Sequence, residues 1–598
     1  MSELENGIEE MGIKIPTHRC KLPLDPIKTA ASVTTYEPIF KWAHMVGAQW
    51  ANDAGMIVTD SAYYLERMKP KKVKYEDSLF EVWSTTDLTR EEMENLTSKE
   101  TKMFRPLGDK EEYWSRARLF KTEKDEVVAR LVSDGRETNL ACDGDLEFQM
   151  AQIEDIIRAM LMIGKGFYVV ADARHWFYAH KINTAWARTM AVLFEGNVYL
   201  PNVMAMGHKA SAYCGGLLCW AMVLMTAGED PLLGVREEDL KKKPVILFLY
   251  DGGNIVGFIV VYIDNIMIAC KDAALARRWE TRLYKNARRL NKVHFKHDKV
   301  FIFMEGKVNY LGIDYEWMTN DIMKWRWAEE KREKWIVQFQ SVSITPWTDR
   351  CVASWVGTSV WKTRIAMKPL FVINAFIEIV KEMGATNKHR DDWDAVLDKK
   401  TFSRLKDVLN ELWEYISTKQ EWTATQREPR QPTVFVVVDA CTSTGRGILR
   451  YSNEGEVFQE IFYPNGVLDV SFILETQIIC EMLETLCECR HGATCNFKKG
   501  QAIRCGSDCT AAIYCAMRFY SRNPKACKLL KAAWEWLQRH DSELQMRFIP
   551  GIFMAADQTS RLETLDDLKV KESWKRLQLA LELPRKKSRD DKKDPEYE

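Results

Sequence analysis

Three strongly apolar runs in this chain each carry an aspartate. FYVVAD ends at Asp172, IVVYIDNIMI contains Asp264, and VFVVVDA contains Asp439. Short runs of β-branched and aromatic residues are typical of buried strands. A carboxylate beside such residues is costly unless a cation or a hydrogen-bond partner satisfies it. The chain is therefore predicted to contain sheets that gather negative charge at their strand ends.

The predicted strands fall into two blocks. In the first, KPVILFLY and NIVGFIVVYIDNIMIAC are joined at Asp-Gly-Gly, which is a hairpin signal, and the second opens at TVFVVVDACTSTGRGILRY. LEFQMAQIEDIIRAMLMIG has apolar residues at helical spacing and is predicted to be a helix. Residues 321–428, between the blocks, are rich in Trp and Lys and are predicted to be mainly helical. We expect an α+β and α/β multidomain protein.

Length and charge narrow the class of protein. The chain has 598 residues, too many for one compact core, and equal numbers of Lys+Arg and Asp+Glu, 85 each. Any attraction to nucleic acid must therefore come from local basic patches. The acidic N-terminus has no apolar signal core, and no stretch reads as long and uncharged enough to span a bilayer. With 15 scattered cysteines, we expect free thiols and an intracellular location, cytoplasmic or nuclear, without a membrane.

Asp172 and Asp264 are the first candidate catalytic pair. Either aspartate alone could simply cap a strand or a turn. If the two converge, they could hold two Mg²⁺ or Mn²⁺ ions about 4 Å apart, which would activate an attacking hydroxyl and stabilise a leaving phosphate. The motifs around them decide between these interpretations.

Those motifs resemble, in chain order, the reverse transcriptase family. ARLVSDGRETN resembles the fingers segment, VVADARHWFY motif A, YLPNVMAMGHKASAY motif B, YIDN motif C, and FKHDKVFIF with NYLGIDYE motifs D and E. The resemblance implies metal binding by Asp172 and Asp264, and exclusion of the ribose 2′-hydroxyl by Phe177. It also implies a general acid at Lys299 and a primer grip at Leu311–Gly312. The residues that it implies around the incoming nucleotide are Lys124, Arg130, Asp134, Arg136, Asn139, Met206 and Gly207.

The sequence departs from the family pattern at four positions. Asn265 replaces the second Asp of motif C, which removes one negative charge beside the metals but keeps an oxygen ligand. Met206 and Ala212 replace the usual residues of motif B, and His175 stands where an acidic residue is common. These changes are typical of divergence or of early decay of a mobile element.

A second set of motifs resembles RNase H. VVVDACTSTGRGILRY resembles the first strand and hairpin, ILETQIICEMLETL the next helix, and FIPGIFMAADQTSR the last motif. The resemblance places Asp439, Glu475, Asp508 and Asp557 around two metal ions. Four carboxylates at strand and helix ends are what a two-metal phosphodiesterase needs, although Asp508 alone could be a helix cap. No His stands near Asp557, so the auxiliary His of retroviral enzymes is not matched.

Two further features have alternative interpretations. Cys487, Cys489, His491 and Cys495 could hold zinc, or could simply be neighbouring reduced residues. ALARRWETRLYKNARRLNK and MKWRWAEEKREKW interleave basic and aromatic residues, as a nucleic-acid groove does, but solvated helix faces give the same pattern.

The resemblance implies a right-hand polymerase followed by a helical connection and an RNase H-like α/β domain. The expected divisions are an N-terminal extension of unknown role (1–100), fingers and palm (101–320), thumb and connection (321–428), RNase H (429–575) and a charged tail (576–598). The order of domains resembles that of tyrosine-recombinase retrotransposons of the DIRS/Ngaro/VIPER group.

The implied function is RNA-directed DNA synthesis with hydrolysis of the RNA of the hybrid. Expected partners are an RNA template, a DNA primer, the RNA–DNA hybrid, dNTPs and other proteins encoded by the same element. The competing hypothesis is a decayed or domesticated protein that binds nucleic acid without polymerising.

Overall fold

The computed structural model divides the chain into two compact units. Unit 1 comprises residues 1–151 and 165–308, and unit 2 comprises residues 152–164 and 309–598. The structure describes residues 20–25, 36–73, 88–124, 126–144, 146, 149–173, 175–230, 233–291, 302–318, 321–338, 347–379, 396–425, 430–466, 469–486, 500–521 and 523–578.

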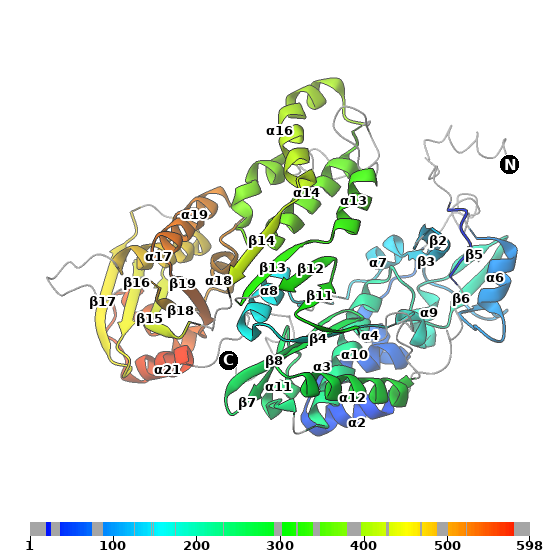
Figure 1. Cartoon of the computed structure of the whole chain (residues 1–598), viewed down its shortest axis with the longest axis horizontal. Coiled ribbons are helices and arrows are strands. Elements are labelled where there is room, and N and C mark those ends of the chain that lie inside the picture. Colours follow the sequence, from blue (N-terminus) through cyan, green and yellow to red (C-terminus); the bar gives the residue numbers. More distant parts are fainter. Residues whose placement is uncertain are drawn as a thin grey trace. The chain divides into compact units, whose positions relative to one another are not determined.

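Unit 1 contains a five-stranded antiparallel sheet (Figure 1). Its strand order is β10 (Ile302–Glu305), β4 (Phe167–Asp172), β9 (Asn265–Cys270), β8 (Asn254–Tyr262) and β7 (Leu247–Asp251). The turn between β7 and β8 contains Gly252 and Gly253, both with positive φ, which confirms the predicted hairpin.

Helices pack against this sheet through one continuous apolar core. The core includes residues of α10 (Lys209–Gly228) and α12 (Ala273–Asn291) together with alternate residues of β4, β8 and β9. Three helices of the predicted N-terminal extension also belong to it, namely α2 (Glu37–Val46), α3 (Gln49–Thr59) and α4 (Ser61–Met68). Much of the predicted extension is thus an integral part of unit 1.

The remainder of unit 1 contains two small sheets. One has the order β1 (Phe104–Pro106), β6 (Asn197–Pro201) and β5 (Val192–Phe194), and the other is the hairpin of β2 (Arg118–Glu123) and β3 (Ala129–Asp134). The connecting helices are α6 (Arg90–Thr97), α7 (Arg136–Ala141), α9 (Thr184–Arg188), α11 (Glu237–Lys241) and the 3-10 turn η1 (Phe177–Ala179).

Helix α10 corrects one expectation from the sequence. By length and composition alone it could cross a membrane, with one Lys as its single charged residue. However, 94% of its apolar window is buried inside the protein, as in the core helix of a globular unit.

Unit 2 contains a four-stranded sheet and a helical subdomain. The sheet order is β11 (Lys307–Tyr310), β12 (Ile313–Trp317), β13 (Ile322–Trp327) and β14 (Glu421–Thr425). The helices are α8 (Ile153–Ile163), which was predicted, α13 (Glu329–Gln338), α14 (Asp349–Ile365), η4 (Leu370–Ile373) and α16 (Lys399–Ser417). Residues 321–428 are therefore not simply helical, because β13 and β14 complete the sheet.

The second sheet of unit 2 is mixed and has helices on both faces (Figure 1). Its order is β17 (Val457–Pro464), β16 (Gly445–Tyr451), β15 (Pro432–Ala440), β18 (Ala502–Ser507) and β19 (Glu543–Phe548). Val436 and Val438 of β15 pack with α17 (Ser471–Thr485), α18 (Thr510–Arg518) and α19 (Pro524–Arg539). Phe435 and Val437 lie in the opposite core, with η5 (Gly551–Phe553), α20 (Ala555–Ser560) and α21 (Asp567–Gln578). This alternation confirms the predicted buried strand.

Candidate active sites

The end of β4 and the turn between β8 and β9 bring the first candidate pair together. Asp172 is directly opposite Asn265 in the antiparallel register of β4 and β9. Asp264 lies in the turn that precedes Asn265, and the Ala173 N–H donates to its carbonyl oxygen at 3.4 Å. The Asn265 side-chain amide lies 3.5 Å from the Asp264 carboxylate. Both carboxylates thus lie at one edge of the sheet, and both are half-buried.

The β8–β9 turn is strained at Ile263. Its φ is +59°, a region that β-branched residues rarely occupy. Such strain persists only where the surrounding structure enforces it, here the ladder of β8 and β9 and the contact with Ala173. The same contacts keep Asp264 beside the end of β4.

Predicted motif B is clamped to the predicted fingers segment. The Ser133 N–H donates to the Met206 carbonyl at 3.1 Å, and the Asn139 amide donates to the Gly207 carbonyl at 2.8 Å. Gly207 has φ +108°, and a Cβ there would collide with the Ser133 carbonyl oxygen. Glycine is therefore required by both conformation and space.

The predicted nucleotide-binding cations have different partners. Arg136 pairs with Asp134, its Nε lying 2.9 Å from a carboxylate oxygen. Burial opposes ionisation of Asp134, but the hydrogen bonds from Arg136 outweigh it and lower the pKa of Asp134 below its usual value. Lys124 pairs with Asp25 at 2.5 Å, and Arg130 is exposed on β3. No motif in the sequence pointed to Asp25.

Phe177 lies against helix α10. Its ring is so close to Gly215 that a Cβ there would come within 2.8 Å of it, and the neighbouring Trp176 indole donates to the Gly215 carbonyl at 3.0 Å. A small residue on α10 thus leaves room for the aromatic ring five residues after Asp172. Lys299 and the four candidate zinc ligands lie outside the described residues.

The second candidate site is a cluster of two buried carboxylates and one half-buried carboxylate in unit 2. Ligand atoms of Asp439, Glu475 and Asp508 all lie within 4.8 Å of one another. Asp439 lies near the end of β15, and Asp508 directly follows β18, its parallel neighbour, so both side chains are at the same sheet edge. Glu475 comes from the second turn of α17, which packs on β15.

Hydrogen bonds fix the orientation of these carboxylates. The Ala440 N–H donates to Glu475 Oε1 at 3.1 Å, and the Ser507 hydroxyl to Oε2 at 3.4 Å. The Ser560 hydroxyl of α20 donates to Asp439 Oδ2 at 2.6 Å. Ser560 was not identified as a site residue from the sequence, although it lies one helical turn after Asp557.

The electrostatics of the cluster favour a bound cation. Burial, followed by the charges of Asp439 and Asp508, raises the pKa of Glu475 to about 9. Burial raises the pKa of Asp439 to about 6, with the charges of Asp508 and Asp557 adding to it. Carboxylates that repel one another in a buried place are a suitable donor set for hard divalent cations, which prefer oxygen ligands.

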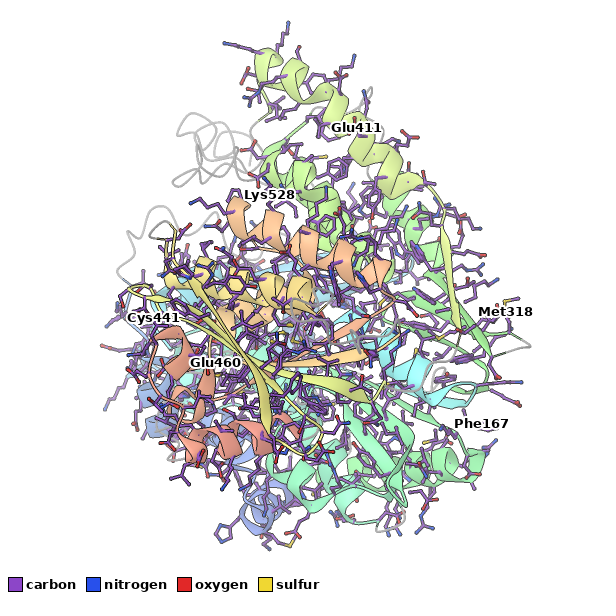
Figure 2. The ribbon with its side chains drawn as sticks, turned by 90° about the vertical axis from the view of Figure 1, so that its left-hand side faces the viewer. Phe167, Met318, Glu411, Cys441, Glu460 and Lys528 are labelled. Carbon is purple, nitrogen blue, oxygen red and sulfur yellow. The ribbon has the colours of Figure 1, made fainter. Side chains whose placement is uncertain are left out.

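Asp557 lies at the border of this cluster, in the first turn of α20. The Ser560 hydroxyl, which contacts Asp439, also lies 2.9 Å from the Asp557 carbonyl oxygen, and the charge of Asp557 raises the pKa of Asp439. The Arg561 Nε donates to its Oδ1 at 2.7 Å, and the Lys569 Nζ lies 3.8 Å from its Oδ2. The Thr559 hydroxyl of α20 donates to Glu460 of β17 at 2.7 Å, so a second contact joins α20 to the sheet. Figure 2 labels Glu460 and also Cys441, which directly follows the end of β15.

The basic and aromatic stretches are largely engaged within the protein. On α12, Trp279 is fully buried and Arg278 pairs with Asp230. On β13, Trp325 is buried and donates to the Ile365 carbonyl at 2.7 Å, while Arg326 pairs with Glu421 at 2.8 Å. These contacts favour the interpretation that the residues involved stabilise the fold, and not that they form a nucleic-acid groove.

Comparison with known proteins gave distant structural matches. No protein-family model matches the chain, and no curated protein matches it. The structure of the foamy viral protease-reverse transcriptase in complex with dsDNA matches with 13% identity and a TM-score of 0.39, covering 92% of this chain and 93% of that chain. Its complex with an RNA/DNA hybrid matches with 14% identity and a TM-score of 0.38, covering 87% of this chain and 58% of that chain. The chain is a mixed α+β multidomain protein that is similar to these structures at low identity.

Proposed function

We propose that this protein is an RNA-directed DNA polymerase with an RNase H activity. The observation that carries the proposal is the convergence of Asp439, Glu475 and Asp508 within 4.8 Å at one sheet edge. The adjacency of Asp172 to the Asp264–Asn265 turn supports a second, separate site in unit 1. Two carboxylate sites in one chain fit one enzyme that makes a DNA strand and removes the RNA strand.

Mg²⁺ or Mn²⁺ would supply the same chemistry at both sites, by lowering the pKa of an attacking hydroxyl or water and offsetting charge on the leaving oxygen. Asp172 and Asp264 would hold it in unit 1, where the Asn265 amide oxygen is a neutral donor beside them. In unit 2 the holding residues would be Asp439, Glu475, Asp508 and Asp557.

Other side chains would bind and orient the substrates. Lys124, Arg130 and Arg136 would bind the triphosphate of a dNTP as charge-assisted donors. Phe177, held against α10, would exclude a ribose 2′-hydroxyl. Ser560 would orient the Asp439 carboxylate, to which it donates at 2.6 Å. The partners are an RNA template, a DNA primer and their hybrid.

The test is primer extension on an RNA template with dNTPs and Mg²⁺. We expect Asp172→Ala to abolish DNA synthesis and to leave RNA cleavage intact. Asp439→Asn should have the converse effect. Asp251→Ala is the matched control for the first variant, because Asp251 is an exposed aspartate that ends strand β7, at the opposite end of the same sheet. Folded wild-type protein that binds a hybrid but neither extends nor cleaves it would favour the decayed, binding-only alternative.

The origin of the chain is a further part of the proposal. The order of the polymerase and RNase H motifs supports a retrotransposon of the DIRS/Ngaro/VIPER group and an intracellular role. Finding this coding sequence beside a tyrosine recombinase gene would support that origin, whereas an adjacent integrase of another class would contradict it.

A further inference from the structure

Residues 20–25 form a strand-like addition to the β2–β3 hairpin. Leu24 makes a parallel bridge with Ala129, the Asp25 N–H donates to the Ala129 carbonyl at 2.9 Å, and the Ala129 N–H donates to the Pro23 carbonyl at 2.7 Å. The segment thus follows the free edge of β3, and its backbone positions the Asp25 side chain.

Side chains anchor the same segment. Lys121 donates to the Leu22 carbonyl at 2.9 Å and pairs with Glu92 at 3.1 Å. Glu92 also accepts from the Leu24 N–H at 3.2 Å. Leu24 packs against an apolar cluster that includes Leu119 and Leu131 of the hairpin. Leu24 and Leu22 therefore have defined contacts apart from those of Asp25.

The Asp25 carboxylate lies between the Lys124 ammonium and the His175 imidazole, which is a cation only when protonated. Its Oδ2 is 2.5 Å from the Lys124 Nζ and 3.8 Å from the His175 Nε2. Lys124 ends the β2 side of the hairpin turn, and His175 follows Asp172 by three residues. The side chains are mostly buried, 28% exposed for Lys124 and 13% for Asp25. Three segments that are distant in sequence thus meet at one place, where a carboxylate of the protein lies against Lys124. His175 links this place to Asp172, which precedes it by three residues.

We propose that Asp25 sets the affinity of this site for the polyphosphate of the incoming nucleotide. The inference rests on the proposed polymerase function and adds a residue to it. A phosphate group carries more charge and more acceptor oxygens than a carboxylate, so it can replace Asp25 on Lys124. Because Asp25 neutralises Lys124 in the absence of nucleotide, each binding event must first break this ion pair. Asp25 is a competitor for Lys124 and lowers nucleotide affinity.

The first test measures binding of inorganic tripolyphosphate and of dATP by calorimetry, without primer or template. We expect Asp25→Asn to bind both about fivefold more tightly than the wild type, the effect of a partly exposed ion pair. Glu123→Gln is the matched control, because it removes the same charge from an exposed residue adjacent to Lys124 and should change affinity less. On a Lys124→Ala background, Asp25→Asn should have no effect.

The outcomes separate this inference from the proposed function. Equal affinities of wild type and Asp25→Asn would overturn the role of Asp25 and leave the nucleotide site intact. Weaker binding by Asp25→Asn would show that Asp25 supports Lys124, which also overturns the proposal. If neither protein binds either ligand, the nucleotide site itself is refuted, and the polymerase function with it.

A second measurement follows the segment directly in the wild type. Tripolyphosphate at saturation should speed hydrogen exchange of the Asp25 amide, which is bonded to the Ala129 carbonyl, because the ion pair that holds the end of the segment is lost. Unchanged exchange at saturation would contradict displacement.

Discussion

Glu475 is expected to destabilise the metal-free β15–β19 sheet at neutral pH, and Glu475→Gln should remove this effect. Its pKa is raised from 4.5 to about 9, mainly by burial and then by the charges of Asp439 and Asp508. The unfolded chain loses this proton near pH 4.5, whereas the folded chain keeps it until about pH 9. The stability that protonated Glu475 contributes to the folded state is therefore fully present below pH 4.5 and is lost as the pH rises toward 9.

The size of the effect follows from the pKa shift. Each pH unit between the two pKa values costs about 1.4 kcal/mol. From pH 4.5 to about pH 7 the unfolding free energy therefore falls by about 3 kcal/mol, because Glu475 is buried, with 3% of its surface exposed. Gln is neutral at every pH, and its amide oxygen can still accept from the Ala440 N–H. The variant should be more stable than the wild type at neutral pH.

The assay is urea unfolding in EDTA, read by hydrogen-exchange mass spectrometry of the β15 and β18 peptides, so that the signal comes from this sheet alone. The unfolding free energy of the wild type should fall by about 3 kcal/mol between about pH 5.5 and about pH 7.5, and that of Glu475→Gln should fall clearly less. Mg²⁺ should stabilise the wild type more than the variant, because a bound cation favours the ionised cluster. Glu481→Gln on the same helix is the control, since it breaks the ion pair with Arg446 and should destabilise at both pH values.

One result would refute this reasoning. If Glu475→Gln unfolds at lower urea than the wild type at neutral pH and keeps the same pH slope, Glu475 is a stabilising hydrogen-bond acceptor. The carboxylates would then not be a strained, cation-seeking cluster, and the assignment of this site to metal binding would lose its electrostatic basis.

Three further predictions concern the two sites. Gly207→Ala should destabilise unit 1 by about 3 kcal/mol, because the new Cβ meets the Ser133 carbonyl, and an unchanged melting temperature would contradict the clamp. Asn265→Asp, which adds a carboxylate opposite Asp172, should lower the Mg²⁺ concentration needed for primer extension by about fivefold, and no change would place the metal away from this turn. Gly447→Ala should reduce RNA cleavage but not DNA synthesis, because its Cβ would lie 2.7 Å from the Ser560 nitrogen and displace α20 from β16. Equal losses of both activities would argue against two independent sites.

Local pattern was enough to locate most strand ends of the candidate sites. FYVVAD was predicted to be a strand that ends at Asp172, and β4 ends there. Glu475 was predicted near the start of a helix and Asp508 between a strand and a helix, and the structure has both in these places. These features follow from short-range periodicity and steric preference, which the sequence displays directly.

Local pattern failed where pairing with a distant segment decided the conformation. The stretch IMKWRW was read as part of a helical region, but it forms β13 because β12 and β14 flank it and bury its alternate residues Met323 and Trp325. Its composition of Trp, Lys and Arg does not distinguish a helix from a strand. Only the neighbouring strands fix the period of two.

The juxtaposition of charges was decided by tertiary structure alone. The sequence shows that Asp439, Glu475 and Asp508 exist, but the packing of α17 on β15 and the parallel pairing of β15 with β18 bring their ligand atoms within 4.8 Å. The pKa shifts arise from that proximity and burial. Asp25 reaches Lys124, 99 residues away, only because its segment pairs with β3. The sequence by itself therefore determined that Asp172, Asp439 and Asp508 lie at strand ends. Long-range pairing determined which carboxylates meet, because contact between distant segments depends on the global fold.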